Sequence, residues 1–357
     1  MGKRLAGNQR STTFLTLSFT FILNKVMQFR HLLLSCLFLG FTVSSFGQHQ
    51  NQKVDIIFDT DMGPDYDDVG AITVLHALAD SGKANILATM ASNKYQGIAG
   101  VLNVFNTYFN RPGIPIGVPK GNAVSEADWQ HWSDTILQRY PHAIKSNEEV
   151  PDAVTLYRKI LAGRPDKSVT IVTVGFFTNL ANLLNSKPDT YSKLSGKELV
   201  ARKVKQLVSM AGHFPKGREF NVLRDSTASV EVFQQWPTNI LFSGFEIGEK
   251  IKTGLPLIHN QQIKNSPVKD AFSIAIPKAA EDAAGRMSWD QTAVLVAVTS
   301  PVPYFDVVPG RIICYASGSN DWDNNGSGHF YLIPKLPTAE VTDFINYLMQ
   351  HQPKKRK

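Results

Sequence analysis

Residues 54–71 read VDIIFDTDMGPDYDDVGA, an apolar run that leads into a cluster of acids and then into a helix-like pattern. The β-branched residues at 54–58 predict a buried strand. Five carboxylates follow within ten residues, namely those of Asp59, Asp61, Asp65, Asp67 and Asp68. Carboxylates this close repel one another unless a cation lies among them, so a cluster at the end of a strand indicates a hard-cation site. The alternative is a solvated acidic loop, for which folding alone has no need.

Strand and helix patterns alternate through most of the chain. Strands are predicted at 54–58, 86–91, 114–118, 169–174, 204–210 and 239–245, and helices at 68–80, 97–109, 179–184 and 227–235. Near-continuous apolar strands separated by helices indicate a parallel sheet covered on both faces. We therefore predict an α/β fold with an open, mostly parallel, Rossmann-like sheet and helices on both faces. Ligands of such sheets lie beyond the carboxyl ends of the strands.

The first 50 residues have the features of an export signal. A short basic start at Met27 precedes an apolar run from Leu32 to Val43, and small residues precede Gln48, where a signal peptidase would cut. We expect residues 1–47 to be a signal peptide with an upstream extension from a misassigned start codon. The run is too short to span a bilayer, and Cys36 lies inside it, which disfavours a lipoprotein. The expected location is a bacterial periplasm or the extracellular space.

The distribution of charge excludes one class of partner. The net charge is +7, but residues 1–47 carry +5 and the tail Lys354-Lys355-Arg356-Lys357 carries +4, which leaves −2 for residues 48–353. A nucleic-acid-binding protein would carry its positive charge on the folded body, so nucleic acid is not an expected partner. Without the signal only Cys314 remains, so no internal disulfide can form. We expect one domain over residues 48–350, followed by a basic tail at 351–357.

Four later polar segments lie at the ends of predicted strands or open a helix. They are Ser92-Asn93, Gly175 to Asn179, Ala211-Gly212-His213 with Arg218 to Asn221, and Ser288 to Ala293. Each alone is compatible with a helix cap, a turn or a surface acid. Their joint placement favours a single shared site.

In this order the motifs resemble the inosine-uridine-preferring nucleoside hydrolases. That family opens with Asp-x-Asp-x-Gly after a strand and with an Asp-Asp pair before a helix, which Asp59 to Gly63 and Asp67-Asp68 match. Pro64-Asp65-Tyr66 makes the loop between them longer than usual. The resemblance spans roughly residues 54–300 and continues through Asn93, Val174, Met210-Ala211-Gly212, Glu219-Phe220-Asn221 and Asp290.

The resemblance implies hydrolysis of the N-glycosidic bond of ribonucleosides to ribose and free base, by a water that Ca²⁺ activates. It implies that Asp61, Asp68, Asp290 and the Val174 carbonyl bind Ca²⁺, an ion that prefers oxygen ligands. Asp61 would also accept the proton of the attacking water. The ribose hydroxyls would be bound by Asp67, Asn93, Glu219 and Asn221.

The chain departs from the family pattern beside the last aspartate. Trp289 stands where many members place a histidine that helps the base to leave, and we expect its indole to stack on the base. An indole is not an acid at neutral pH. His213, Tyr66 or Asp65 would then supply the proton, or the base would leave unaided. A second departure is residues 213–217, which replace a Gly-Asn pair that usually gives a further ribose contact.

Other functions fit parts of the pattern. Asp59-Thr60-Asp61 after a strand is also typical of haloacid-dehalogenase-like phosphatases, but we find no phosphate-binding lysine and acidic pair in the order of that class. An EF-hand fails because Gly70 or Ile72 stands where the bidentate glutamate should be. The main alternative is a calcium-dependent nucleoside- or ribose-binding protein without turnover, which Trp289 supports and the retained aspartates oppose. The expected partner is a small nucleoside; no stable membrane span is expected, and a homo-oligomer is left open.

Overall fold

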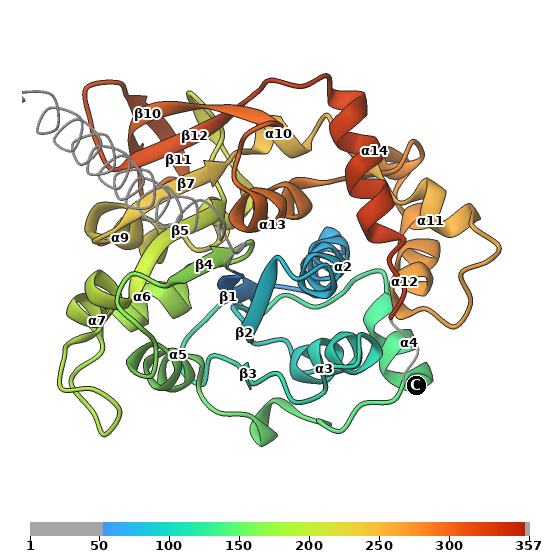
Figure 1. The fold of residues 1–357 in the computed structure, drawn as a ribbon, viewed down its shortest axis with the longest axis horizontal. Helices are drawn as coiled ribbons and strands as arrows, with labels where there is room; N and C mark the ends of the chain where they lie inside the picture. Colours follow the sequence, from blue (N-terminus) through green and yellow to red (C-terminus); the bar gives the residue numbers. More distant parts are fainter. Residues whose placement is uncertain (1–52, 354–357) are drawn as a thin grey trace, which may run out of the picture. The chain divides into compact units, whose positions relative to one another are not determined.

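The chain enters a ten-stranded sheet at an interior strand and builds outward from it. The computed structural model describes residues 53–353, so the expected signal peptide, Cys36 and most of the basic tail lie outside the described residues. The strand order is β3-β2-β1-β4-β5-β7-β12-β10-β11-β6 (Figure 1). The first seven of these are all parallel neighbours. They are β3 (Ile116–Gly117), β2 (Ala84–Ala91), β1 (Val54–Thr60), β4 (Val169–Thr173), β5 (Val204–Met210), β7 (Asn239–Ser243) and β12 (His329–Pro334).

An antiparallel extension completes the sheet. β10 (Phe305–Cys314) runs antiparallel to β12 and to β11 (Ser319–Asp323), and β11 pairs with the short β6 (Gly217–Arg218). These antiparallel strands were not predicted from the sequence. The sheet is nevertheless mostly parallel, so the predicted α/β class is confirmed.

Alternate side chains of each strand enter two separate hydrophobic cores, as expected for a sheet covered on both faces. Ile56 and Phe58 of β1 belong to one core and Ile57 to the other. The first core is shared with α2 (Asp67–Asp80), α3 (Ile98–Tyr108), α12 (Pro267–Ala275), α13 (Trp289–Thr299) and α14 (Thr338–Met349). The second is shared with α5 (Ala153–Ala162), α6 (Thr178–Asn185), α7 (Gly196–Lys203) and α9 (Ser226–Gln235), as Figure 1 illustrates.

The packing of α2 against α13 brings two distant acidic segments together. A Cβ at Gly70 of α2 would lie only 2.3 Å from the side-chain amide nitrogen of Gln291 in α13. The absence of a side chain at Gly70 therefore permits the close approach of Gln291 to α2. Asp67 and Asp68 occupy the first turn of α2, and Asp290 the first turn of α13. Helix N-termini favour negative charge. The two helix starts therefore present three carboxylates to the same region.

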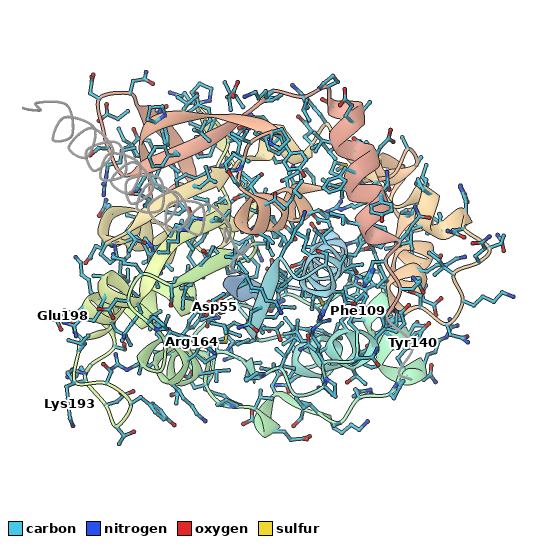
Figure 2. The ribbon with its side chains drawn as sticks, in the orientation of Figure 1. Asp55, Phe109, Tyr140, Arg164, Lys193 and Glu198 are labelled. Carbon is cyan, nitrogen blue, oxygen red and sulfur yellow. The ribbon has the colours of Figure 1, made fainter. Side chains whose placement is uncertain are left out.

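Short elements connect the sheet to the site. They are α4 (Trp132–Arg139), α8 (Phe220–Arg224), α10 (Phe245–Gly248), α11 (Leu255–His259), β8 (Lys252–Thr253) and β9 (Arg286–Met287). At the other end of β1, Asp55 pairs with Arg164 at 3.4 Å, both labelled in Figure 2. The predicted strand at 239–245 ends at Ser243 because α10 begins at Phe245. No helix within residues 53–353 is long and apolar enough to cross a bilayer.

Candidate active site

The floor of the site is formed where β1, β4 and β5 end. Two backbone hydrogen bonds hold the neighbouring segments in register, from the Val174 amide to the Asp59 carbonyl and from the Ser92 amide to the Thr60 carbonyl, each 2.8 Å long. A Cβ at Gly175 would lie 2.4 Å from the Asp61 amide nitrogen, so only glycine allows this approach. Asp61 is consequently fixed in a buried position at the carboxyl end of the sheet.

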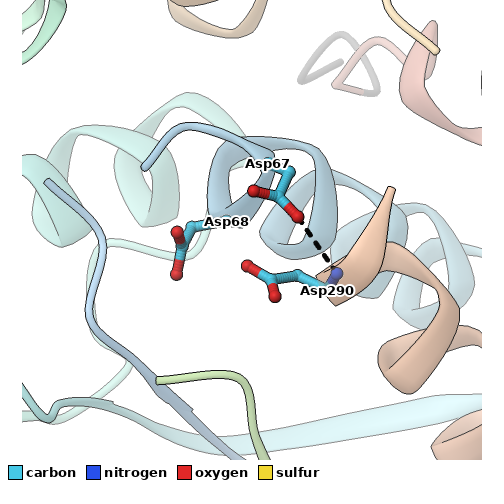
Figure 3. A group of neighbouring side chains, drawn as sticks. All are labelled: Asp67, Asp68 and Asp290. Atoms are coloured by element: carbon cyan, nitrogen blue, oxygen red, sulfur yellow. Dashed lines mark hydrogen bonds between the residues drawn. The ribbon is translucent and has the colours of Figure 1, made fainter. Parts of the chain in front are cut away.

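Three carboxylates converge above this floor. Asp67, Asp68 and Asp290 each offer an oxygen, and these atoms lie within 4.8 Å of one another (Figure 3). The Asp290 amide donates to Asp67 Oδ2 at 3.2 Å, which ties the two helix starts together. The structure thus brings together Asp68 and Asp290, both predicted as metal ligands, and adds Asp67, which was predicted to bind ribose. Asp61 lines the same cavity but is not one of the three.

The cluster is electrostatically unfavourable without a cation. Burial, followed by the charges of neighbouring carboxylates, raises the pKa of Asp61, Asp67 and Asp290 well above the usual range. Burial also raises the pKa of Asp68 to about 7, with the Asp65 charge contributing. One Asp68 oxygen accepts a hydrogen bond from the Thr60 hydroxyl, whereas the other is buried with no hydrogen-bond partner in the described part of the chain. A buried, unpartnered oxygen among carboxylates fits a divalent cation.

The acidic cluster opens into a cavity of about 270 Å³. Its polar lining consists of the carboxylates with Glu219 and Asn221. Its aromatic lining consists of Phe220, Phe245 and Trp289, and Met287 and Arg286 also line it. A lining of both kinds suits a ligand that combines a hydroxylated ring with a flat heterocycle.

The predicted ribose-binding residues do not all face the cavity. Glu219 is the N-cap of α8, and it accepts hydrogen bonds from the amides of Asn221 and Val222 at 2.7 and 3.1 Å. Burial raises the pKa of Glu219 to about 7 despite these bonds. The side-chain amide of Asn221 donates a hydrogen bond to the Val174 carbonyl at 2.9 Å. Asn93 does not line the cavity, because its amide nitrogen donates to the Asp61 and Glu126 carbonyls at 3.1 and 2.8 Å. It therefore holds the Asp61 backbone.

Trp289 lines the cavity. Its indole N–H donates to the Phe245 carbonyl at 2.8 Å, and the two rings are 5.1 Å apart with an interplanar angle of 30°. The hydrogen bond fixes the orientation of the ring, which also contacts the Arg286 guanidinium, with the guanidinium carbon 5.0 Å from the ring centroid. The contact of Trp289 to a base stays a prediction.

Neither Tyr66 nor Asp65 is suited to protonate a leaving base. The Tyr66 hydroxyl donates to Asp282 at 2.6 Å, and burial and this acceptor raise the pKa of the phenol. Burial would raise the pKa of Asp65, but the Arg286 charge and the hydrogen bonds from Tyr66 and Asp67 together lower that pKa, so Asp65 is ionised. His213 contacts Phe245 at 5.3 Å between ring centroids but does not line the cavity.

Two residues have roles that the sequence did not indicate. Asp59 belongs to the first motif, yet its carboxylate accepts hydrogen bonds from Tyr157 at 2.7 Å and Asn179 at 3.2 Å and does not line the cavity. Arg286 does line it, and pairs with Asp65 and Asp67. In the sequence, Arg286 is distinguished only as an isolated basic residue four positions before Asp290.

Comparisons with known proteins agree with this geometry. The family model for inosine-uridine preferring nucleoside hydrolases matches residues 56–314. The pyrimidine-specific ribonucleoside hydrolase RihA of Enterobacter sp. (strain 638) is 29% identical over 235 residues, which are 63% of this chain and 67% of that protein. The purine-preferring ribonucleoside hydrolase from Gardnerella vaginalis has a TM-score of 0.66 at 15% identity, over 83% of this chain and 99% of its own. The inosine-uridine preferring enzyme from Bacillus anthracis has a TM-score of 0.61 at 13% identity, over the same shares.

Proposed function

The chain belongs to the inosine-uridine preferring nucleoside hydrolases, and from this premise we propose that it cleaves ribonucleosides with a water activated at a calcium site. Family membership makes the chain a hydrolase and supports ribonucleosides as its substrates. The observation that carries the proposal is the buried carboxylate cluster, with its unpartnered Asp68 oxygen, at the polar end of the cavity. A hard cation with oxygen ligands is the natural counter-charge there.

Asp68 and Asp290, with Asp61 and the Val174 carbonyl beside them, would hold the calcium ion. When bound, the ion would orient the ribose 2′- and 3′-hydroxyls and lower the pKa of a coordinated water. Asp61 would take the proton of the water that attacks C1′, because it is fixed at the floor of the same cavity.

The ribose would lie at the polar end of the cavity. Asp67, Glu219 and Asn221 line this end and offer acceptors and an amide to the ribose hydroxyls. Asn93 would contribute by holding the Asp61 backbone. Hydroxyl contacts of this kind select the sugar strongly, because a substrate that lacks a hydroxyl leaves buried polar groups unpaired.

The base would lie against Trp289 and Phe245 on the aromatic side. The relatives named above include a pyrimidine-specific and a purine-preferring enzyme, so the identity of the base does not follow from family membership. Stacking on an indole accepts either kind of base. We therefore propose a ribonucleoside hydrolase whose selectivity for the sugar exceeds its selectivity for the base.

The test is to incubate the protein with a panel of purine and pyrimidine ribonucleosides and to measure free ribose, with calcium and after chelation. We expect release of ribose with calcium, its loss after chelation, and recovery when calcium is restored. Asp61→Ala should abolish release while its circular dichroism spectrum stays that of the wild type. Binding of nucleosides without any release of ribose would refute the proposal and favour the non-catalytic alternative.

We also propose that the protein acts outside the cytoplasm. The basic start at Met27, the apolar run after it and the small residues before Gln48 support export. A calcium site suits compartments that are rich in this ion. N-terminal sequencing from the native host should find a start near Gln48; a start at Met1 or Met27 would refute export, and an acylated Cys36 would establish a lipoprotein instead.

A further inference from the structure

We propose that Arg286 stabilises the negative charge that develops on the departing base, and that the longer loop carrying Asp65 exists to hold this arginine in place. The inference rests on the proposed function and assigns a role in the same site. It identifies the substrates as ribosides whose leaving group departs as an anion, such as bases with a carbonyl conjugated to the glycosidic nitrogen.

Arg286 lines the cavity beside Trp289, the residue proposed to contact the base. It belongs to β9 and lines the cavity together with Trp289, Met287 and Phe245. Its guanidinium carbon is 5.0 Å from the Trp289 ring centroid and 5.1 Å from that of Tyr66. A guanidinium that contacts two aromatic rings is fixed in position, and the Arg286 Nε is buried and has no hydrogen-bond partner in the described part of the chain. Arg286 is the one cation that lines this cavity in the described chain.

Three carboxylates fix the guanidinium, two from the loop before α2 and the first turn of α2 and one from four residues before Arg286. Asp65 makes the shortest contact, Asp67 lies 3.4 Å from Nη2, and Asp282 lies 3.5 Å from Nη1. Asp282 is itself held by the Tyr66 hydroxyl at 2.6 Å. Asp65 and Tyr66 both come from the longer loop, so this loop supplies two of the groups that position Arg286.

A positive charge beside the leaving base would assist the reaction. Water attacks C1′ and forms a C–O bond, its proton passes to Asp61, and the C1′–N bond breaks with its electron pair moving to the base. The base therefore leaves with a negative charge unless an acid protonates it, and neither Tyr66 nor Asp65 is such an acid. A fixed guanidinium stabilises the charge as it forms. The base then takes a proton from solvent, and ribose plus neutral base are the products.

A structural role for the same ion pairs makes a different prediction. Arg286 also contacts Asp67, which is expected to bind ribose. If Arg286 only shaped the ribose site, its loss would impair all ribosides equally. If it stabilises the leaving anion, its loss would impair poor leaving groups selectively.

The experiment compares Arg286→Met and Arg286→Lys with the wild type on two substrates. One is the ribonucleoside that the wild type cleaves best, and the other is p-nitrophenyl β-D-ribofuranoside or a halogenated nucleoside with a more acidic base. We expect Arg286→Met to lose about 10²-fold or more in kcat/KM on the ordinary nucleoside, and less than about tenfold on the activated riboside. Arg286→Lys keeps the charge and should regain part of the loss. Equal losses of Arg286→Met on both substrates would overturn the inference.

Two further variants serve as controls. Arg111→Met removes an arginine that pairs with Asp80 at the C-terminal end of α2. Asp80 lies about 20 Å from Asp67 along this helix, at 1.5 Å per residue. This variant should leave the ratio of kcat/KM for the two substrates unchanged. Asp65→Asn, at a partly exposed position, removes an ion pair that positions Arg286 but keeps the arginine itself. It is the substitute test if Arg286→Met does not fold. It should reduce cleavage of the ordinary nucleoside severalfold more than that of the activated riboside, and an unchanged ratio would overturn the inference. A wild type that cleaves no riboside would instead overturn the proposed function.

Discussion

Replacing Asp68 with asparagine should separate stability from metal binding, because the change removes a buried charge and keeps the shape of the side chain. Asp68 is fully buried, and its pKa is raised from 3.8 to about 7. A folded pKa above the unfolded value means that ionisation costs stability. The cost is absent below pH 4, grows as the pH rises, and is complete above pH 7.

The size of this cost follows from the same two values. At about 1.4 kcal/mol per pKa unit, a rise from 3.8 to about 7 amounts to about 4 kcal/mol at pH 8. Asparagine carries no charge and still accepts the hydrogen bond from the Thr60 hydroxyl. In chelator at pH 8, Asp68→Asn should therefore raise the free energy of unfolding by up to about 4 kcal/mol, measured by urea denaturation.

Calcium should narrow this difference in stability. An ion present at a hundredfold excess over its Kd stabilises the wild type by about 2.7 kcal/mol, whereas the variant, which lacks a ligand, should gain little. Asp59→Asn is the matched control, since Asp59 is also buried with a pKa of about 7 but does not line the cavity. Asp59→Asn should keep the calcium response. A calcium response in Asp68→Asn equal to that of the wild type would refute the assignment of the metal site.

Three further changes test other parts of the structure. Trp289→Ala should raise KM for nucleosides more than it lowers kcat, because the ring supplies stacking; loss of stability at unchanged KM would show a purely structural role. Gly175→Ala places a Cβ 2.4 Å from the Asp61 amide nitrogen, and should cost about 1–3 kcal/mol of stability and most of the activity, in thermal and ribose-release assays. Burial lowers the pKa of His76 from 6.5 to about 3. Between these values the imidazole binds a proton only in the unfolded chain, so stability decreases as the pH is lowered below 6.5. His76→Gln should lose about 2 kcal/mol less than the wild type between pH 7.5 and pH 5 in urea denaturation, and equal losses would contradict this.

The parallel half of the sheet was predictable because its strands are buried on both faces. Their sequences are runs of apolar residues, and the strand at 204–210 was predicted with the bounds observed for β5. β10 and β11 were not predicted because they face solvent on one side and contain interruptions. β10 carries Pro309 and Gly310 within it, and β11 contains the buried Asn320 and four half-buried positions. A half-exposed strand of mixed composition has no clear pattern in one sequence.

The site was predictable where residues adjacent in sequence share a strand end. Asp61 and the Asp67-Asp68 pair followed from one local motif. Arg286 was not predictable, because its role depends on the pairing with Asp65, which is 221 residues away in the sequence. The role of Asn93 is also a tertiary property, since sequence alone does not show whether an amide faces a cavity or a neighbouring backbone.

The two ends of the cavity differ in how freely they can diverge. The part of the cavity proposed to bind the sugar is built from the carboxyl ends of the inner parallel strands, where the approach of Gly175 to Asp61 tolerates no side chain. The part proposed to bind the leaving group is built from short peripheral elements, α10 and β9, together with the first residue of α13. Substitutions in these peripheral segments leave the inner strands untouched, so selection for a new base can proceed there without loss of the sugar site. Such a division makes the chain a suitable starting point for engineering hydrolases with altered leaving groups.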